Sequence, residues 1–119
     1  MTEKNYEVST ISGVTLITLG PKLASAYESV LAELGEIPEL AASIDPPQMM
    51  VDLGVIEYCG SAFVGFLFKL AGILNHRDGG EFAVCCPNNF TKMVFKTTKS
   101  EVVFSIFDSV DDGIARLSE

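Results

Sequence analysis

The chain has 119 residues, which suits one domain with a single hydrophobic core. Hydrophobic residues make up 48% of it and charged residues 20%, proportions typical of a globular protein that exclude an intrinsically disordered chain. The formal net charge of -8 argues against nucleic acid and anionic membranes as partners, because both attract basic surfaces. We therefore expect residues 1–119 to form one acidic domain.

The sequence carries no signal for secretion or membrane insertion. The opening residues MTEKN lack the apolar segment of a secretory signal. The longest apolar stretch, Ala62 to Leu74, is interrupted by Lys69 and is too short to span a bilayer. We expect a cytoplasmic protein that does not insert into a membrane.

The cysteines do not have the spacing of a metal site. Cys59, Cys85 and Cys86 form no C-x-x-C pair, and His76 is the single histidine. This pattern predicts free thiols in a reducing compartment, not zinc ligands. We therefore expect neither a metal nor another cofactor.

The first part of the chain predicts two strands and a helix. Strands are expected at Tyr6 to Ile11 and Val14 to Leu19, and the short turn between them makes them antiparallel neighbours. A helix is expected to begin near Pro21 and to end near Gly35. Its apolar positions recur at helical spacing: Leu23, Tyr27, Val30, Leu31 and Leu34.

A proline-rich loop is expected next, at Glu36 to Gln48. This loop is either irregular throughout or contains one helical turn at residues 39–43. The remaining chain alternates between predicted strands and helices. The strands are Met49 to Leu53, Glu81 to Cys86 and Val102 to Phe107. The helices are Ser61 to Arg77, a short one with apolar positions Phe90, Met93, Val94 and Thr97, and a last one capped by Asp108-Ser109 with Val110, Ile114 and Leu117.

This order predicts an α/β fold. Alternating strands and helices require parallel strands joined by crossover helices, so only the first strand can be antiparallel. The helix from Ser61 has one broad apolar side. Val64 and Phe68 fall beside its opposite stripe, where Gly65 and Lys69 lie. Val64 and Phe68 either tuck under a neighbouring loop or form an exposed apolar strip for a partner helix.

The turn before this helix is a candidate site because it has no bulky side chain and leads onto a helix N-terminus. Ser61 has two alternative roles here, as N-cap of the helix or as a phosphorylated hydroxyl.

A catalytic site cannot be assembled from these residues. A thiol near a helix N-terminus can have a lowered pKa, which makes Cys59 the candidate nucleophile. His76, however, lies about 25 Å away along the helix, so it cannot serve as the base that a nucleophile requires. We expect no catalytic residue and no enzyme activity.

The order of elements, together with the segment VDLGVIEYCGSAFVGFLFKL, resembles the STAS domain, the fold of sulfate-transporter tails and anti-sigma factor antagonists. In that family a strand ending in Asp-Leu leads through an approach segment to a D-[ST]-[ST]-[GA] loop and a helix. Here Asp52-Leu53 matches the strand end, Val55 to Tyr58 match the approach, and Cys59 to Ala62 take the place of the loop. The resemblance implies a STAS fold, with a mixed sheet of four to five strands and about four helices.

The resemblance also implies a phosphoacceptor-loop equivalent at Cys59, Gly60, Ser61 and Ala62. In anti-sigma factor antagonists a partner kinase phosphorylates the first hydroxyl of this loop, and Gly60 occupies that position here. Ser61 matches the neighbouring family hydroxyl, whereas Cys59 replaces the loop aspartate. We therefore expect partner binding without the usual phosphorylation switch.

Our first hypothesis is a bacterial protein-interaction module of sigma factor and transcription regulation. It would bind an anti-sigma factor or serine-kinase-like protein and release the sigma factor that this partner holds. Contact is expected at the loop and the helix face, through Pro21, Lys22, Val64, Gly65 and Phe68. A homodimer is also compatible with the sequence.

The alternative, also drawn from the resemblance, is a small-molecule component that senses or carries a nucleotide or a lipid-pathway compound. That function requires a pocket beside Ser61.

Overall fold

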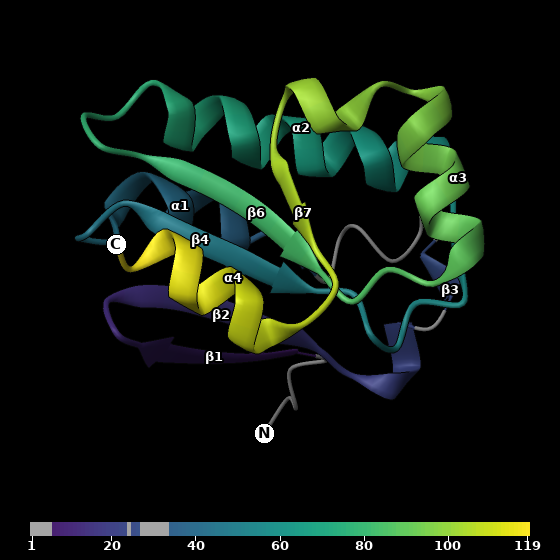
Figure 1. Cartoon of the computed structure of the whole chain (residues 1–119), viewed down its shortest axis with the longest axis horizontal. Helices are drawn as coiled ribbons and strands as arrows, with labels where there is room; N and C mark the ends of the chain where they lie inside the picture. Colours follow the sequence, from purple (N-terminus) through teal and green to yellow (C-terminus); the bar gives the residue numbers. More distant parts are fainter. Residues whose placement is uncertain (1–5, 24, 27–33) are drawn as a thin grey trace.

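The computed structural model describes residues 6–23, 25–26 and 34–119. In this part of the chain a five-stranded sheet has the order β1-β2-β4-β6-β7 (Figure 1). β1 is antiparallel to β2, and every later pair is parallel, so the expected mixed sheet is confirmed. The strands are β1 (Tyr6–Ile11), β2 (Val14–Leu19), β4 (Gln48–Asp52), β6 (Glu81–Cys85) and β7 (Ser105–Phe107).

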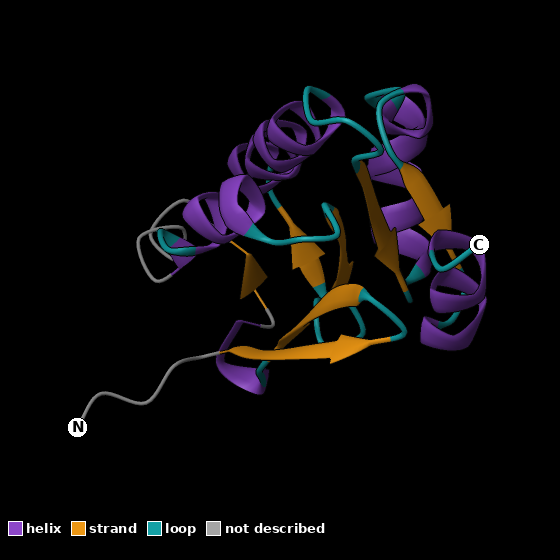
Figure 2. Ribbon diagram, turned by 90° about the vertical axis from the view of Figure 1, so that its left-hand side faces the viewer, coloured by secondary structure: helices purple, strands orange, loops and turns teal. Residues whose placement is uncertain are grey.

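Helices cover both faces of this sheet (Figure 2). A large core lies beneath α1, α2 and α3, and a smaller core lies beneath α4. Side chains of β4 point alternately to the two faces of the sheet and so contribute to both cores. Met49 and Val51 lie in the larger core, and Met50 lies in the smaller one. The helices are α1 (Ile37–Ser43), α2 (Ser61–Asn75), α3 (Asn89–Thr97) and α4 (Val110–Leu117).

The long helix α2 forms where the apolar periodicity predicts it. Its buried side chains include Phe63, Leu67, Leu70 and Leu74, which lie on one side of the helix at spacings of three and four residues. The helix ends at Asn75, two residues before the predicted end, and a turn leads into β6. α2 is therefore held against the sheet by a continuous apolar face.

The prediction of a helix that begins at Pro21 is wrong for the first part of this segment. Pro21–Leu23 forms a 3₁₀ turn, and Ser25–Ala26 forms the short strand β3. β3 pairs in parallel with β5 (Tyr58–Cys59), and this long-range pairing overrides the local helical periodicity. Three of the other predicted apolar positions, Tyr27, Val30 and Leu31, lie outside the described residues, and Leu34 is buried in the large core.

Two other segments differ from expectation in their secondary structure. Within the proline-rich loop, Ile37–Ser43 forms the full helix α1, with a proline in its first turn. The last strand is shorter than predicted because residues Ser100–Val102 form a 3₁₀ turn. This turn directs Phe104 into the large core, so pairing with β6 begins only at Ser105.

Two helical glycines provide a matched test of this packing. A Cβ at Gly113 of α4 would overlap the sulfur of buried Met50, whereas a Cβ at Gly72 of α2 would meet open space. We expect Gly113→Ala to lower the free energy of unfolding, because the cost of overpacking a core, about 1–3 kcal/mol, exceeds the helix-propensity gain of roughly 0.5–1 kcal/mol. Gly72→Ala should raise it by roughly 0.5–1 kcal/mol through helix propensity. Urea denaturation measures both, and equal effects would contradict the proposed packing of α4.

Candidate functional site

The turn 59–62 lies where the parallel strands of the main sheet end and α2 begins. β5 leads into this turn and is held by its pairing with β3, which places Ala26 opposite Cys59. The N-terminus of α2 lies beside α3 and β3 (Figure 1). Sites at this edge are common in α/β folds because several strand-to-helix loops meet there.

Gly60, not Ser61, is the N-cap of α2. The Gly60 carbonyl accepts the N–H groups of Phe63 and Val64 at 3.1 and 3.2 Å. Ser61 is the exposed first residue of the helix, so its predicted N-cap role is wrong. A glycine N-cap offers no side-chain oxygen, and no side chain among the described residues caps the helix start. Because the N–H groups of Phe63 and Val64 already donate to Gly60, those of Ser61 and Ala62 are the candidates for hydrogen bonds to a partner.

Cys59 is not a reactive thiol. The residue is 3% exposed, and burial raises the pKa of its thiol to about 11. The thiol is therefore protonated at neutral pH, although it lies one residue before a helix N-cap. This environment suits a core residue that holds the loop in place.

Asn88 joins the candidate loop to α3. Its Nδ2 donates to the carbonyl oxygens of Ile56 and Glu57 at 3.0 and 3.2 Å, and its Oδ1 accepts the Thr91 N–H at 2.8 Å. Asn88 is therefore the N-cap of α3. One side chain both caps a helix and ties the approach to the turn against it.

The strip expected at Val64 and Phe68 is not an exposed apolar surface. Val64 is 3% exposed and belongs to the large core, and the half-buried Phe68 packs on Phe104 with 6.0 Å between ring centroids. The periodicity placed both residues beside the polar stripe. In the structure the chain segment before β7 covers part of this side of the helix.

Of the other expected contact positions, Gly65 is exposed and has open space around it. Pro21 is exposed in its 3₁₀ turn, and the backbone of Lys22 lies in the same turn. The pairing of β3 with β5 places the segment that follows this turn alongside the approach to Ser61.

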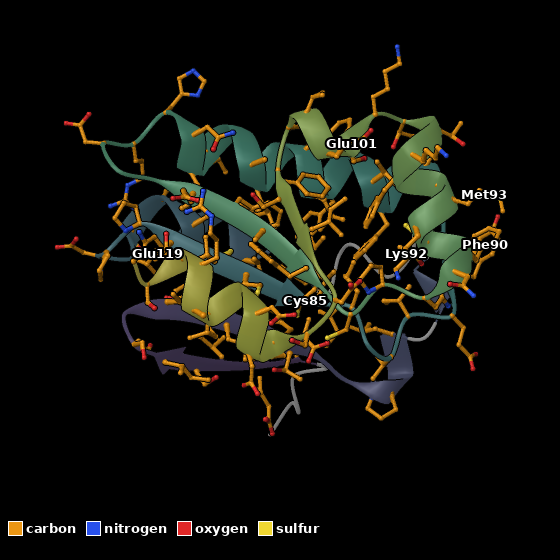
Figure 3. All side chains as sticks on the ribbon, viewed as in Figure 1. Cys85, Phe90, Lys92, Met93, Glu101 and Glu119 are labelled. Atoms are coloured by element: carbon orange, nitrogen blue, oxygen red, sulfur yellow. The ribbon has the colours of Figure 1, made fainter. Side chains whose placement is uncertain are left out.

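An apolar patch that the sequence analysis missed adjoins the turn. Tyr58 stacks on Phe90 with 5.2 Å between ring centroids, and Met93 follows on α3. Tyr58 and Phe90 are each 42% exposed and Met93 is 65% exposed. Figure 3 shows Phe90 and Met93 on the outside of α3. We call Tyr58, Phe90 and Met93 the α3 patch.

The patch was missed because no buried face was assigned to α3 from the sequence. The spacing of Phe90, Met93, Val94 and Thr97 predicted only that a short helix forms here. In the structure Thr91 and Phe95 are the buried residues of this helix, and the ring of Phe95 packs edge-on against Phe104. A helix of nine residues offers too few turns for periodicity alone to select the buried face.

Two surface hollows lie away from Ser61. One of about 440 Å³ lies between β1 and α1 and includes Val8, Glu39 and Leu40. The other, of about 180 Å³, is bordered by Glu81 and Glu101. Residues 59–62 line neither of them.

None of the helices in the described part of the chain has both the length and the apolar character that a membrane span requires. No family profile matches the sequence, and no curated protein matches it either.

Solved structures, in contrast, match nearly the whole chain. An anti-sigma-factor antagonist (STAS) domain protein from Planctomyces limnophilus has a TM-score of 0.88 at 18% identity, covering 96% of this chain and 98% of its own. A candidate anti-sigma factor antagonist from Thermotoga maritima has a TM-score of 0.79 at 14% identity, covering 96% and 95%. An anti-sigma factor antagonist from Mycobacterium paratuberculosis has a TM-score of 0.78 at 18% identity, covering 96% and 93%. The resemblance inferred from the sequence is confirmed at the level of architecture: this protein has the STAS fold.

Proposed function

We propose that this protein is a non-enzymatic, cytoplasmic antagonist that binds an anti-sigma factor of the kinase type and thereby releases a sigma factor. The observation that carries the proposal is the exposed α3 patch beside the start of α2. Exposed apolar surface next to a helix N-terminus that no described side chain caps suits a protein partner, because it combines apolar burial with hydrogen bonding. The structural neighbours, which are described as anti-sigma factor antagonists, support this partner class.

The binding surface that we propose consists of Gly60, Ser61 and the α3 patch, with Gly65 and Pro21 at its margin. Ser61 and Gly65 are exposed on α2, and the α3 patch extends this surface onto the neighbouring helix. α3 also carries exposed Lys96 and exposed Lys92, of which Lys92 forms an ion pair with Asp108 at 3.3 Å. A complementary partner surface would therefore combine apolar groups with acidic ones.

The chain would bind its partner without a phosphorylation switch. Gly60 has no hydroxyl at the position that the family resemblance assigns to the phosphorylated residue. A phosphoryl group would add charge of about −1.5 to −2 and would change the electrostatics of the contact. Without an acceptor at this position, the surface keeps one charge state and binding is constitutive.

The α3 patch provides the first test of this proposal. We expect Met93→Glu to weaken binding to the anti-sigma factor by about tenfold or more, because it places a charge in an apolar contact. Titration calorimetry with individually purified anti-sigma factors measures the change. Val102→Glu is the matched control, because Val102 is 80% exposed on the turn before β7 and not in the patch. Equal loss in both variants, or no loss in the first, would contradict the surface.

A hydroxyl that accepts a phosphoryl group can be introduced at position 60 by the substitution Gly60→Ser. We expect the unmodified chain to incorporate little phosphate when incubated with its kinase partner and ATP. Gly60→Ser should permit labelling at position 60 and weaken binding once labelled. The same change should stabilise α2 by a few tenths of a kcal/mol, because serine is a better N-cap than glycine. Mass spectrometry locates the phosphate, and stoichiometric labelling of Ser61 in the unmodified chain would disprove the absence of a switch.

Variants of Asn88 test whether partner binding requires the loop before α2 to be held against α3. Asn88→Asp keeps the N-cap acceptor but removes the two donations to Ile56 and Glu57. We expect faster amide exchange in residues 55–62 and weaker partner binding, with α3 intact. Asn88→Ala should in addition lower the free energy of unfolding by about 1–2 kcal/mol through the lost cap. Hydrogen–deuterium exchange that is unchanged in Asn88→Asp would rule out this role.

A further inference from the structure

Three potential metal ligands meet on the face of the sheet that α4 covers. One oxygen of Asp52 and the sulfur atoms of Cys85 and Cys86 all lie within 4.8 Å of one another. Figure 3 shows Cys85 near the end of β6. Cysteine spacing and the single histidine led us to expect no zinc site, because a carboxylate supplied by a neighbouring strand was not considered.

Strand register brings two of these ligands together. Asp52 and Cys85 are paired residues at the carboxyl ends of the parallel strands β4 and β6. Cys85 faces the smaller core, and alternation from Met50 places Asp52 on the same face. The sheet itself therefore fixes the spacing of the carboxylate and the first thiol.

An unusual backbone conformation brings the third ligand to them. Successive side chains of a strand point to opposite faces, which would separate Cys86 from Cys85. Cys86 instead has φ of 63°, in the left-handed region that residues other than glycine rarely adopt. The Cys86 N–H donates to the carbonyl of Phe107 at 3.0 Å and holds this turn. Strained backbone of this kind clusters at functional sites.

Neighbouring backbone groups orient two of the ligands. The Gly54 N–H donates to Asp52 Oδ1 at 2.8 Å, which leaves the other carboxylate oxygen for an ion. Burial is the main cause that raises the pKa of the Cys86 thiol, and the Val110 N–H, at the start of α4, opposes this rise. Such outer contacts are the usual support of metal ligands. Asp52 and Cys86 are only partly buried, so an ion can reach them from solvent.

We propose that Asp52, Cys85 and Cys86 form a binding site for one thiophilic divalent cation of the zinc class. Two thiolates and a carboxylate are ligands that zinc prefers, and water would complete a tetrahedron. The three ligand atoms are at most 4.8 Å apart, so an ion centred between them would lie no more than about 2.8 Å from each, and contraction by at most roughly half an ångström reaches the zinc–sulfur bond length. Binding replaces the two thiol protons, which are released to solvent.

The thiols are protonated in the absence of an ion. Burial is the main cause that raises the pKa of both, and the neighbouring Asp52 carboxylate adds to it. A divalent cation reverses this balance because it compensates the charge of two thiolates and a carboxylate in a poorly solvated place.

The test is cobalt and zinc binding to the reduced, metal-free full chain. We expect one Co²⁺ per chain with the absorption of a tetrahedral thiolate complex, displaced by one Zn²⁺. Cys86→Ser and Asp52→Asn should each weaken Zn²⁺ binding at least about tenfold. Cys86→Ser should also reduce the thiolate charge-transfer band by about half. Circular dichroism verifies that both variants are folded.

Cys59→Ser is the matched control, since Cys59 is a cysteine outside the cluster and should leave the affinity unchanged. The site is disproved if the reduced chain binds no stoichiometric ion. It is also disproved if Cys86→Ser binds zinc like the unmodified chain, or if the cobalt complex shows octahedral absorption without thiolate bands.

Discussion

The packing of α2 against the central strands is the interaction on which the rest of the structure depends. Leu67, Leu70 and Leu74 are fully buried in the core that also contains Met49 and Val51 of β4. Each such side chain contributes about 1.5–3 kcal/mol by leaving water. The buried face of α2 fixes the position of the helix axis and therefore the position of its N-terminus. The candidate surface lies around this N-terminus.

The start of α2 combines a rigid surrounding with an open end. Pairing of β5 with β3 and the donations from Asn88 hold the approach on two sides. Gly60 then leaves the helix N-terminus without a side-chain cap. A rigid surrounding keeps the entropy cost of binding low, since little chain must be ordered when a partner arrives. The residues that stabilise the fold through the core are therefore different from the residues that leave the N-terminus of α2 accessible to a partner.

The sequence predicts the fold well because periodicity reports burial over long segments. The strands of the sheet and the fifteen-residue helix α2 were located to within a few residues for this reason. Periodicity fails to predict the secondary structure where long-range contacts determine it. Ser25–Ala26, for example, pairs with β5 and does not continue the predicted helix. The candidate surface was only partly predicted: the turn at Gly60 was recognised, whereas the α3 patch depends on how a short helix is rotated on the core. The proximity of Asp52 to Cys85 depends on strand register, which no local pattern shows.

The position of the α3 patch has a consequence for how such proteins diverge. Phe90 and Met93 are exposed, whereas Thr91 and Phe95 on the same helix are buried. Substitutions at exposed positions usually change stability by no more than about 0.5 kcal/mol. Mutation can therefore alter the outer side of α3 without threatening folding, and chains that share this scaffold can acquire new binding preferences there while their interiors stay constrained.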